Sequence, residues 1–517
     1  MFITRKNKKW WVLVAMTGSL SMILLDSTIV GVCLPTIQYN LSMSTTGLEW
    51  VVNAYMLAIA SLVAIGGSLG DAIGRKKTFI AGTIIFALTS ACCSIASTGA
   101  FLIFSRGLQG IGAALMVPAS AAILTISFEL EERGRAISIY TGISTIFMAL
   151  GPLIGGFLSQ YVSWRWCFYI NLPIAVTSIV LTLVSCPKDH ITRVQKIDFQ
   201  GSATFIVGAV CLVLGLQEAA NLGWDSPFTI GLILFGIGMF LFFIKLEKKK
   251  ESPLIDLRLF KYDNFAVDFF VLFFLSLAMI GQIFFNMIYV QNVLGFTPLH
   301  AGLISMFTII PLATVVHISG RLLDKIGARK PVIFGLVLVL LSYIIAPVAL
   351  PFQNIYFILP HMALLGAGIG FAMLPSQADA LNRVPGALRG QAAGLTHTSR
   401  RMGSTLGLAL LSTIFNYSDK MRIESIMSSL YIDPKYYHTI IKTLSVPEIF
   451  RIKVLHGIIA EDKIPILVSK LKAAMAMSIS IAYGIGILSV ATALIIAIKK
   501  LKKGKQESEI RDHNISH

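Results

Sequence analysis

GSLGDAIGRKK, residues Gly67 to Lys77, lies between two strongly apolar stretches and contains glycines, one acid and three consecutive basic residues. Glycines followed by a lysine are typical of loops that bind phosphate at a helix N-terminus. The spacing G-x-x-x-x-G-K-[ST] is absent here, and the preceding apolar run, residues 51–69, has the length of a membrane span rather than of a short strand. Phosphate binding therefore explains this stretch poorly.

A second stretch, GRLLDKIGARK, which ends at Lys330, repeats the pattern. Asp324 takes the place of Asp71 and Gly327 the place of Gly74, with the same offset for both pairs. Internal repetition in a strongly apolar chain is typical of transporters built from two related halves.

The composition indicates an integral membrane protein. Of the 517 residues, 55% are hydrophobic and only 13% are charged, which excludes a soluble enzyme with an ordinary solvated surface. Apolar stretches of about 20 residues, long enough to cross a bilayer as helices, recur about fourteen times. The predicted spans are residues 10–34, 48–69, 78–97, 101–126, 135–158, 166–186, 199–219, 227–245, 265–290, 299–319, 331–350, 355–377, 389–415 and 473–498.

Basic residues predict the orientation of these spans. They occupy both terminal tails and alternate loops, including 75–77 and 321–330, whereas the other short loops contain very few. The positive-inside rule then places both termini in the cytoplasm of a multi-pass protein of the cell inner or plasma membrane. Most of the net charge of +17 lies in these loops and does not form the basic face that nucleic-acid binding needs.

Metal and enzyme chemistry find little support in the sequence. The six cysteines lie in or beside apolar spans without C-x-x-C spacing, which favours core packing. His317 and His361 have no partner at a metal-ligand spacing. The sequence shows no pair of a nucleophile and a base that would indicate a membrane enzyme. We therefore expect neither catalysis nor a metal or other cofactor.

Several motifs together resemble the Major Facilitator Superfamily over essentially the whole chain. The opening stretch resembles its signature G-x-L-x-D-x-x-G-R-K, between the second and third helices. RGLQGIGAA in the fourth span and GPLIGG in the fifth resemble its R-x-x-Q-G-x-G-A-A and G-P-x-x-G-G motifs. LDSTIVGVCLP in the first span, WRWCFYINLPI at the start of the sixth and the extra helix pair are similar to the fourteen-helix drug:proton antiporters of the EmrB/QacA group.

The resemblance implies an all-α polytopic membrane protein with the major facilitator fold, in which two linking transmembrane helices join two six-helix bundles. The N-terminal bundle is expected at residues 1–187, the linker at 188–261 and the C-terminal bundle at 262–517. The C-terminal bundle includes a long loop, 416–472, predicted to lie outside the cell. This loop is expected either to form short helices or a hairpin over the exit, or to be passive and solvated.

In the superfamily, the charges of the signature loop help to hold one alternating-access state. The resemblance carries this role to Asp71, Arg75 and Asp324, although a tight turn with a basic membrane anchor explains them as well. The predicted conformational latch comprises Gly67, Asp71, Gly74, Arg75, Asp324 and Gly327.

The G-P-x-x-G-G motif is associated with antiport in the family. Its proline and glycines permit a bend, and plain close helix packing is the alternative. Its residues here are Gly151, Pro152, Gly155 and Gly156.

Charges within the bilayer cost roughly 2.5–3.5 kcal/mol each on insertion scales, so the few that occur are candidates for coupling or recognition. Asp26 in the first span and Arg106 in the fourth lie at comparable predicted depths. Burial and a neighbouring cation act in opposite directions on a carboxyl group, which leaves its charge responsive to access and substrate. Asp26 is therefore the candidate proton carrier, with Arg106 in proton coupling; a buried structural pair is the alternative.

The thirteenth span places His397, Arg400 and Arg401 near mid-membrane, which is costly unless they line a cavity. His397 and Arg400 share one helix face. QacA-like proteins carry carboxylates on this helix to receive cationic drugs, so this departure suits anionic or zwitterionic amphiphiles. A structural or coupling salt bridge is the alternative. Tyr55 is the remaining candidate for the substrate cavity.

Other acids lie near the ends of spans, where we expect them to be solvated at the interface. They are Asp268 and Asp379 at predicted cytoplasmic ends, and Glu49, Glu218 and Asp225 at outer ends.

The sequence thus predicts a proton-coupled multidrug efflux transporter that exports lipophilic compounds by alternating access and is driven by the proton gradient. Its partners would be small lipophilic substrates, protons and the lipid bilayer, with no nucleic acid, while a periplasmic adaptor is left open. One alternative is a dedicated exporter or flippase of an endogenous anionic or zwitterionic metabolite or lipid. An alternative of another class is a transport-inactive membrane sensor or assembly partner.

Overall fold

The computed structural model describes residues 7–186, 198–250, 257–262, 264–384, 389–430, 432 and 464–502. Nearly all of these residues are helical. Helices satisfy every backbone N–H and C=O group within one segment, which a chain crossing lipid requires.

The N-terminal helices are α1 (Lys8–Asn40), α2 (Thr45–Ile73), α3 (Arg75–Ser94), α4 (Gly99–Ser127), α5 (Leu130–Tyr161), α6 (Trp166–Tyr169) and α7 (Asn171–Ser185). They are followed by α8 (Phe199–Leu222), α9 (Pro227–Glu247), the 3-10 turn η1 (Leu257–Lys261), α10 (Phe265–Ile288), the π-helical turn η2 (Tyr289–Val293) and α11 (Pro298–Ile326). The chain then forms α12 (Arg329–Ala349), the short turn η3 (Leu350–Phe352), α13 (Ile355–Asn382), α14 (Arg389–Ser429) and α17 (Ile464–Lys500).

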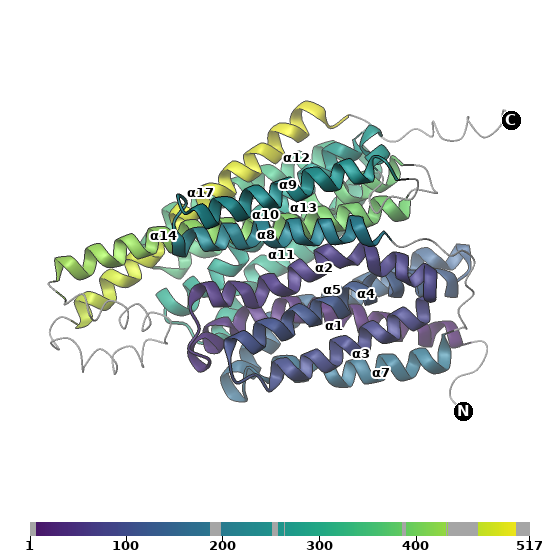
Figure 1. Cartoon of the computed structure of the whole chain (residues 1–517), viewed down its shortest axis with the longest axis horizontal. Helices are drawn as coiled ribbons and strands as arrows, with labels where there is room; N and C mark the ends of the chain where they lie inside the picture. The colour runs from purple at the N-terminus through teal and green to yellow at the C-terminus, as the bar shows by residue number, and fades with distance from the viewer. Residues whose placement is uncertain are drawn as a thin grey trace. The chain divides into compact units, whose positions relative to one another are not determined.

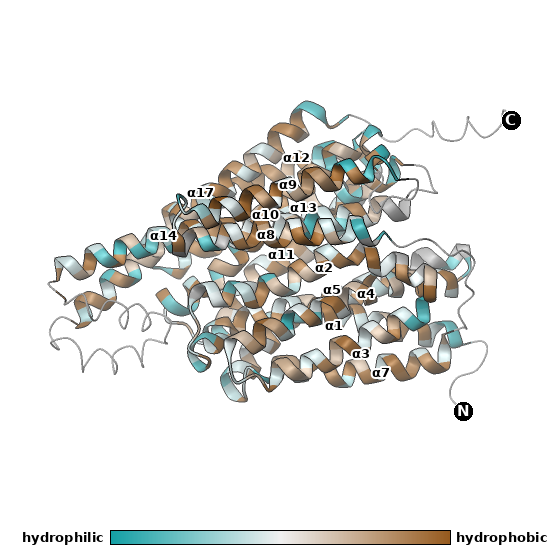
Figure 2. Ribbon diagram, in the orientation of Figure 1, coloured by the Kyte–Doolittle hydropathy of each residue, from teal (hydrophilic) through white to brown (hydrophobic). Residues whose placement is uncertain are grey.

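Each of the fourteen predicted spans coincides with one of these helices, with α6 and α7 together forming the sixth. Within the described residues, twelve helices are long and apolar enough to cross a membrane by length and composition. The other two predicted spans fall in α8, whose apolar part covers only Gln200–Leu216, and in the more polar α14. Figure 2 shows the contrast, because α9 and α10 are brown along most of their length whereas α14 carries much more teal.

The chain divides into two compact units (Figure 1). Unit 1 comprises Met1–Val210, Met287–Ile304 and Ile423–Lys472. Unit 2 comprises Cys211–Asn286, Ser305–Arg422 and Ala473–His517. The domain boundaries expected at residues 187 and 262 stay a prediction.

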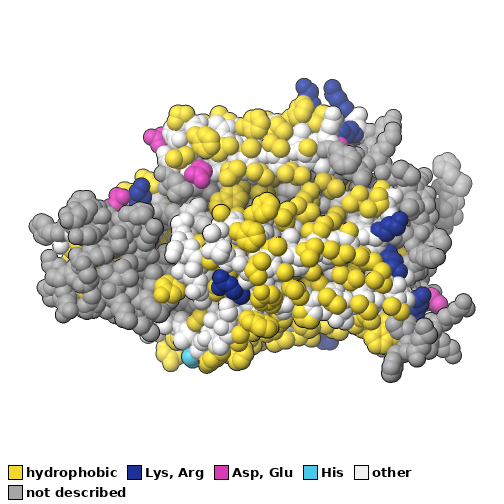
Figure 3. All heavy atoms as spheres, turned by 60° about the horizontal axis from the view of Figure 1, so that its bottom comes forward, with side chains coloured by type: hydrophobic (Ala, Val, Ile, Leu, Met, Phe, Trp, Pro, Cys, Tyr) yellow, Lys and Arg dark blue, Asp and Glu magenta, His cyan; other side chains and the backbone are white. Residues whose placement is uncertain are grey.

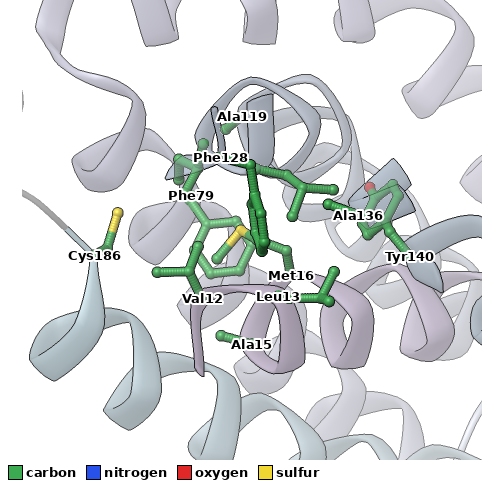
Figure 4. Packing of buried hydrophobic residues seen from close by; sticks show 12 residues of the cluster. Val12, Leu13, Ala15, Met16, Phe79, Ala119, Phe128, Ala136, Tyr140 and Cys186 are labelled. Carbon is green, nitrogen blue, oxygen red and sulfur yellow. The ribbon is translucent and has the colours of Figure 1, made fainter. Parts of the chain in front are cut away.

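In unit 1, a buried apolar cluster fixes the first part of α1 (Figure 4). Phe79 of α3 and Phe128, which follows α4, pack with Val12 and Met16 of α1. The ring of Trp10 packs edge-on against Phe128, with 5.5 Å between the ring centroids. About three helical turns beyond Met16, α1 reaches the polar residues described below, so this cluster holds them at a defined depth.

The two copies of the opening motif end their helices in the same way. Gly74 and Gly327 have φ angles of +109° and +77°, a conformation that glycine adopts without steric penalty. Their N–H groups donate to the carbonyl oxygens of Gly70 and Leu323, four residues back. The repeat seen in sequence is therefore a repeat of backbone geometry.

Helix packing repeats as well. In unit 1, α3 crosses α4 so closely that a Cβ at Gly112 would lie 2.8 Å from the carbonyl oxygen of Gly82. In unit 2, α12 crosses α13 in the same manner, and a Cβ at Gly368 would lie 2.7 Å from the carbonyl oxygen of Gly335. Small residues that let helix backbones approach are typical of packing within membranes.

Large apolar side chains cover the outside of several helices. Only 17% of the most apolar part of α9 is buried, although its mean hydropathy is 2.3. Figure 3 shows one face on which hydrophobic side chains predominate and Lys and Arg side chains are few and scattered. Exposed apolar surface on this scale fits contact with lipid.

α14 and α17 extend into the region 416–472, which had been expected to form one long loop. At about 1.5 Å per residue, helices of 41 and 37 residues exceed a hydrocarbon core of roughly 30 Å. Their extended parts pack together through Ile423, Met427, Ile464, Leu467, Val468 and Leu471. The expectation of a passive solvated loop is therefore wrong at both ends of the region, while residues 433–463 lie outside the described part.

Candidate functional site

Asp26 and Arg106 meet inside unit 1. Arg106 Nη1 lies 2.6 Å from Asp26 Oδ2, and the two residues are 2% and 0% exposed, respectively. Asp26 comes from the middle of α1 and Arg106 from the second turn of α4. Their comparable depth was predictable, and the structure shows that they form a buried ion pair.

Amide and hydroxyl groups surround this pair. Asp26 Oδ1 accepts hydrogen bonds of 3.1 Å from both Gln109 Nε2 and Asn171 Nδ2. Gln109 Oε1 accepts one of 2.7 Å from Arg106 Nη1. Ser90 Oγ on α3 accepts from Gln109 and from Asn171 at 3.3 and 3.0 Å. The ionised carboxylate of Asp26 therefore has three donors from α4 and α7, an arrangement that stabilises its charge.

Asn171 and Ser90 were not predicted as site residues. Asn171 lies in the quoted stretch WRWCFYINLPI, where an amide within an apolar run was the available signal. Its side-chain partners lie on α1 and α3, far away in sequence. Ser90 resembles the many serines that pack between helices, so nothing in the sequence indicates that it accepts hydrogen bonds from Gln109 and Asn171.

Aromatic rings and a backbone carbonyl complete the surroundings of Arg106. Its guanidinium carbon lies 4.2 Å from the ring centroid of Tyr55 and 5.7 Å from that of Phe168. Arg106 Nε donates to the carbonyl oxygen of Val51 at 3.1 Å. Tyr55, 1% exposed, thus packs on the coupling candidate through a cation–π contact. Its contact with substrate stays a prediction.

This arrangement can link proton binding to helix position. One acid and one base together carry no net charge, which makes their burial tolerable. A proton on Asp26 would remove the attraction to Arg106 while leaving the guanidinium with the carbonyl of Val51 and the amide of Gln109. Protonation and the α1–α4 ion pair therefore compete for the same carboxylate.

Unit 2 has a neutral network at the corresponding place. Gln282 Nε2 of α10 lies 3.1 Å from Ser342 Oγ of α12 and 3.2 Å from His361 Nδ1 of α13. His361 precedes Gly368 by about two helical turns, as Arg106 precedes Gly112. Within the described residues, neither an acid nor an arginine takes part in this network. The repeat therefore conserves the position of a polar cluster but not its charge.

The GPLIGG motif forms a close-packing surface of α5. Gly151 has no room for a side chain, because Thr28 of α1 occupies the place where a Cβ would lie. A Cβ at Gly155 would lie 2.6 Å from the carbonyl oxygen of Ile29, and one at Gly156 would lie 2.6 Å from that of Pro298. The motif thus seats α5 against α1 and against the first residues of α11, which belong to the same unit.

The predicted latch is described only in part. Gly67 and Gly74 lie in and after the last turns of α2, and Gly327 follows α11. The side chains of Asp71 and Asp324 lie outside the described residues. The lysine that follows Arg75 is described: Lys76 Nζ donates to the carbonyl oxygens of Leu183 and Cys186, which ties this loop to the end of α7.

His397, Arg400 and Arg401 lie together on α14 in unit 2. Arg400 Nη1 donates to Gln377 Oε1 of α13 at 3.0 Å. In the described part of unit 2, no carboxylate forms a salt bridge with Arg400, in contrast to Arg106 of unit 1. The sequence expectation of a basic site on this helix stays a prediction, and its described partner is a neutral amide.

Three of the acids expected at the interface are instead buried. Glu49, Asp268 and Asp379 are 1%, 0% and 6% exposed. Their predicted solvation is wrong, and for Asp268 and Asp379 the reason is that residues of η1 and α14 pack at this end of α10 and α13. Glu218 and Asp225 are partly or fully exposed, as expected. In the described residues, no group of three or more His, Cys, Asp or Glu could hold a metal ion.

Comparison with known proteins agrees with this architecture. The family model described as Major Facilitator Superfamily matches residues 16–201 and 197–408. Multidrug resistance protein Stp of Mycobacterium tuberculosis is 32% identical over 83% of this chain and 80% of its own length. Puromycin resistance protein pur8 of Streptomyces alboniger is 32% identical over 79% and 82%, respectively. The tetracenomycin C resistance and export protein of Streptomyces glaucescens is 30% identical over 79% and 76%.

A solved structure supports the fold alone. A bacterial homologue of the human lysosomal transporter Spinster, in an inward-facing and occupied conformation, has a TM-score of 0.64. It is 16% identical, and the match covers 96% of this chain and 98% of that one.

Proposed function

Because this chain belongs to the Major Facilitator Superfamily of membrane transporters, we propose that it is a proton-coupled exporter of lipophilic compounds that works by alternating access. The names of three relatives, a multidrug resistance protein and two proteins of antibiotic resistance, support drug-like substrates. The fourteen helices at the predicted places support a position in the fourteen-helix EmrB/QacA group.

The buried ion pair of Asp26 and Arg106 is the observation that carries the proposal. A buried salt bridge of 2.6 Å, surrounded by the side chains of Gln109, Asn171, Tyr55 and Phe168, costs more desolvation free energy than an apolar contact that would join the two helices equally well. Binding of a proton to Asp26 cancels its attraction to Arg106 and releases α1 from α4. Loss of the proton restores the pair, so the two charge states favour different helix arrangements.

Proton flux in proteoliposomes tests this proposal. The purified chain is reconstituted with an internal pH dye, a proton gradient is imposed, and lipophilic compounds of different charge are added in turn. We expect substrate-dependent proton movement in the wild type and in Glu132→Gln, a change of a half-buried surface acid. Asp26→Asn should abolish it. Equal proton movement in Asp26→Asn and wild type would remove Asp26 as the carrier.

Arg400 supports a second candidate, a dedicated exporter of an anionic or zwitterionic amphiphile. In the described residues its partner is the neutral Gln377, and Arg400 and Arg401 both act electrostatically on His397. A basic site of this kind suits a carboxylate or phosphate headgroup. In the same assay, this candidate predicts a response to anionic amphiphiles only, and its loss in Arg400→Gln. A response to cationic compounds that Arg400→Gln leaves unchanged would exclude it.

A further inference from the structure

Asp268, in the first turn of α10, is a buried acid that the proposed cycle does not use. It is 0% exposed, and its Oδ1 accepts a hydrogen bond of 2.7 Å from Ser376 Oγ of α13. Its other oxygen, Oδ2, is buried and has no hydrogen-bond partner among the described residues. A bare carboxylate oxygen in an apolar interior is strongly disfavoured, so a buried ligand at this oxygen needs to be considered.

A second carboxyl group lies beside it. Asp379 of α13, 6% exposed, interacts directly with Asp268. Asp379 Oδ2 accepts hydrogen bonds of 2.9 Å from Asn264 Nδ2 and from Arg383 Nε. Two acids therefore share one arginine, which leaves one uncompensated negative charge if both are ionised.

The groups that face this carboxyl pair come from every packed element. Asn264 precedes α10, Ser376 belongs to α13, and Arg383 directly follows α13. The backbone N–H of Lys502, just beyond α17, donates to Asn264 Oδ1. The adjoining side is apolar and consists of Leu259 of η1, Phe265, Ala380, Val384, and Ala392 and Leu395 of α14. No second basic side chain among the described residues forms a salt bridge with either acid.

We propose that Asp268 and Asp379 form a second proton-binding site, in which one proton is held between Asp268 Oδ2 and the Asp379 carboxyl group. A proton turns Asp268 Oδ2 into a donor, gives it a partner in Asp379 and leaves one negative charge opposite one arginine. One bound proton then accounts for all three features of the site: the Asp268 Oδ2 atom without a partner, the second acid beside it, and the single arginine.

A proton fits this site better than a metal ion does. A bound sodium or calcium ion needs six or so oxygen ligands, whereas Arg383 already occupies Asp379 and repels a cation. Arg383 is also the connection to water, since its side chain is 15% exposed while Asp268 is not exposed at all. Proton exchange thus proceeds past Arg383, at the end of the unit that is predicted to face the cytoplasm.

The two acidic sites are in opposite states. Asp26 accepts hydrogen bonds from Gln109 and Asn171 and has Arg106 to itself, contacts that favour the carboxylate form. Asp268 lacks both, and so it holds a proton. If the proposed function is correct, the chain has one empty and one loaded proton site in the same conformation, and a transport cycle can use both.

Infrared spectroscopy of the full chain in lipid tests proton binding without any transport. A protonated carboxyl group has a carbonyl stretch that is separated from carboxylate bands and shifts in heavy water. We expect this band at neutral pH in wild type, in Asp26→Asn and in Glu132→Gln. We expect its intensity to fall by the contribution of one carboxyl group in Asp268→Asn. The amide of this variant copies the protonated acid in shape and can donate to Asp379, so the variant should fold.

The outcomes separate this inference from the proposed function. A wild type without the band, a band of unchanged intensity in Asp268→Asn, or a band abolished by sodium ions would each overturn the site. The proteoliposome assay then adds the role in transport: Asp268→Asn should move one proton fewer per substrate than wild type. An unchanged ratio would remove the site from the cycle, and no proton coupling in wild type would refute the proposed function while the infrared result stands.

Discussion

The strength of the Asp26–Arg106 pair can be measured with a double-mutant cycle. At an effective dielectric constant of about 20, unit charges separated by the observed 2.6 Å attract each other by about 6 kcal/mol. Asp26→Asn or Arg106→Gln alone leaves the opposite charge buried, and each should lower the free energy of unfolding by about 3–5 kcal/mol. The double variant buries no charge, so its loss should stay below about 2 kcal/mol.

The free energies of unfolding would be obtained from SDS titrations of the purified chain in mixed micelles. The coupling energy between the two sites should then be at least about 4 kcal/mol. Lys9 and Glu132 provide a matched control, because their salt bridge joins α1 to α5 with side chains that are 30% and 40% exposed. Their coupling energy should be less than about 1 kcal/mol.

An additive result at Asp26 and Arg106, with the double variant as unstable as the sum of the single ones, would refute the reasoning. It would mean that the hydrogen bonds to Gln109, Asn171 and Val51, rather than the pairing of charges, stabilise each residue. Proton binding at Asp26 would then not be linked to the position of Arg106, and the proposed coupling step would fail.

Further predictions concern single contacts. Gly155→Ala should lower both the thermal stability and the transport rate, because the new Cβ would meet the carbonyl oxygen of Ile29. Gly142 lies on the same helix and faces open space, so Gly142→Ala should be neutral or should stabilise the fold by up to about 1 kcal/mol. Thermal unfolding and transport rates of the two variants test this contrast. Tyr55→Phe keeps the ring over Arg106 and should retain wild-type stability, while Tyr55→Leu should lose about 0.5–2 kcal/mol in the same SDS titration.

Most of the architecture could be predicted from the sequence, because membrane helices are recognised by the length and hydropathy of their apolar stretches. Each predicted span contains a helix, and the paired motifs around Gly74 and Gly327 revealed the repeat before any coordinates. The ends of α14 and α17 were missed, because helices that leave the apolar core lose the hydropathy signal. There, only apolar periodicity over a few turns pointed to helical structure.

The candidate site was predicted less completely than the fold. Counting residues along a helix gives the depth of a side chain, and this placed Asp26 and Arg106 at one level. It does not give the direction in which a side chain points around the helix axis. The burial of Asp268 and Asp379 was missed for this reason. A residue near the end of a predicted span is expected to contact water. At the ends of α10 and α13, however, apolar side chains of η1 and of the start of α14 form a buried cluster.

The two repeats differ in the charge of their central polar clusters, and this difference bears on the coupling step proposed at Asp26. Both units have a buried polar cluster about two turns from a glycine crossing. Among the described residues, an acid and an arginine pair in the cluster of unit 1, and the cluster of unit 2 contains neither. A neutral cluster of Gln282, Ser342 and His361 can hold α10, α12 and α13 together in any charge state of the cycle. In the proposed cycle, proton binding at Asp26 would loosen the contact between α1 and α4 while the contacts of this neutral cluster stay intact. Such a difference between two charge states is what the proposed alternating access requires.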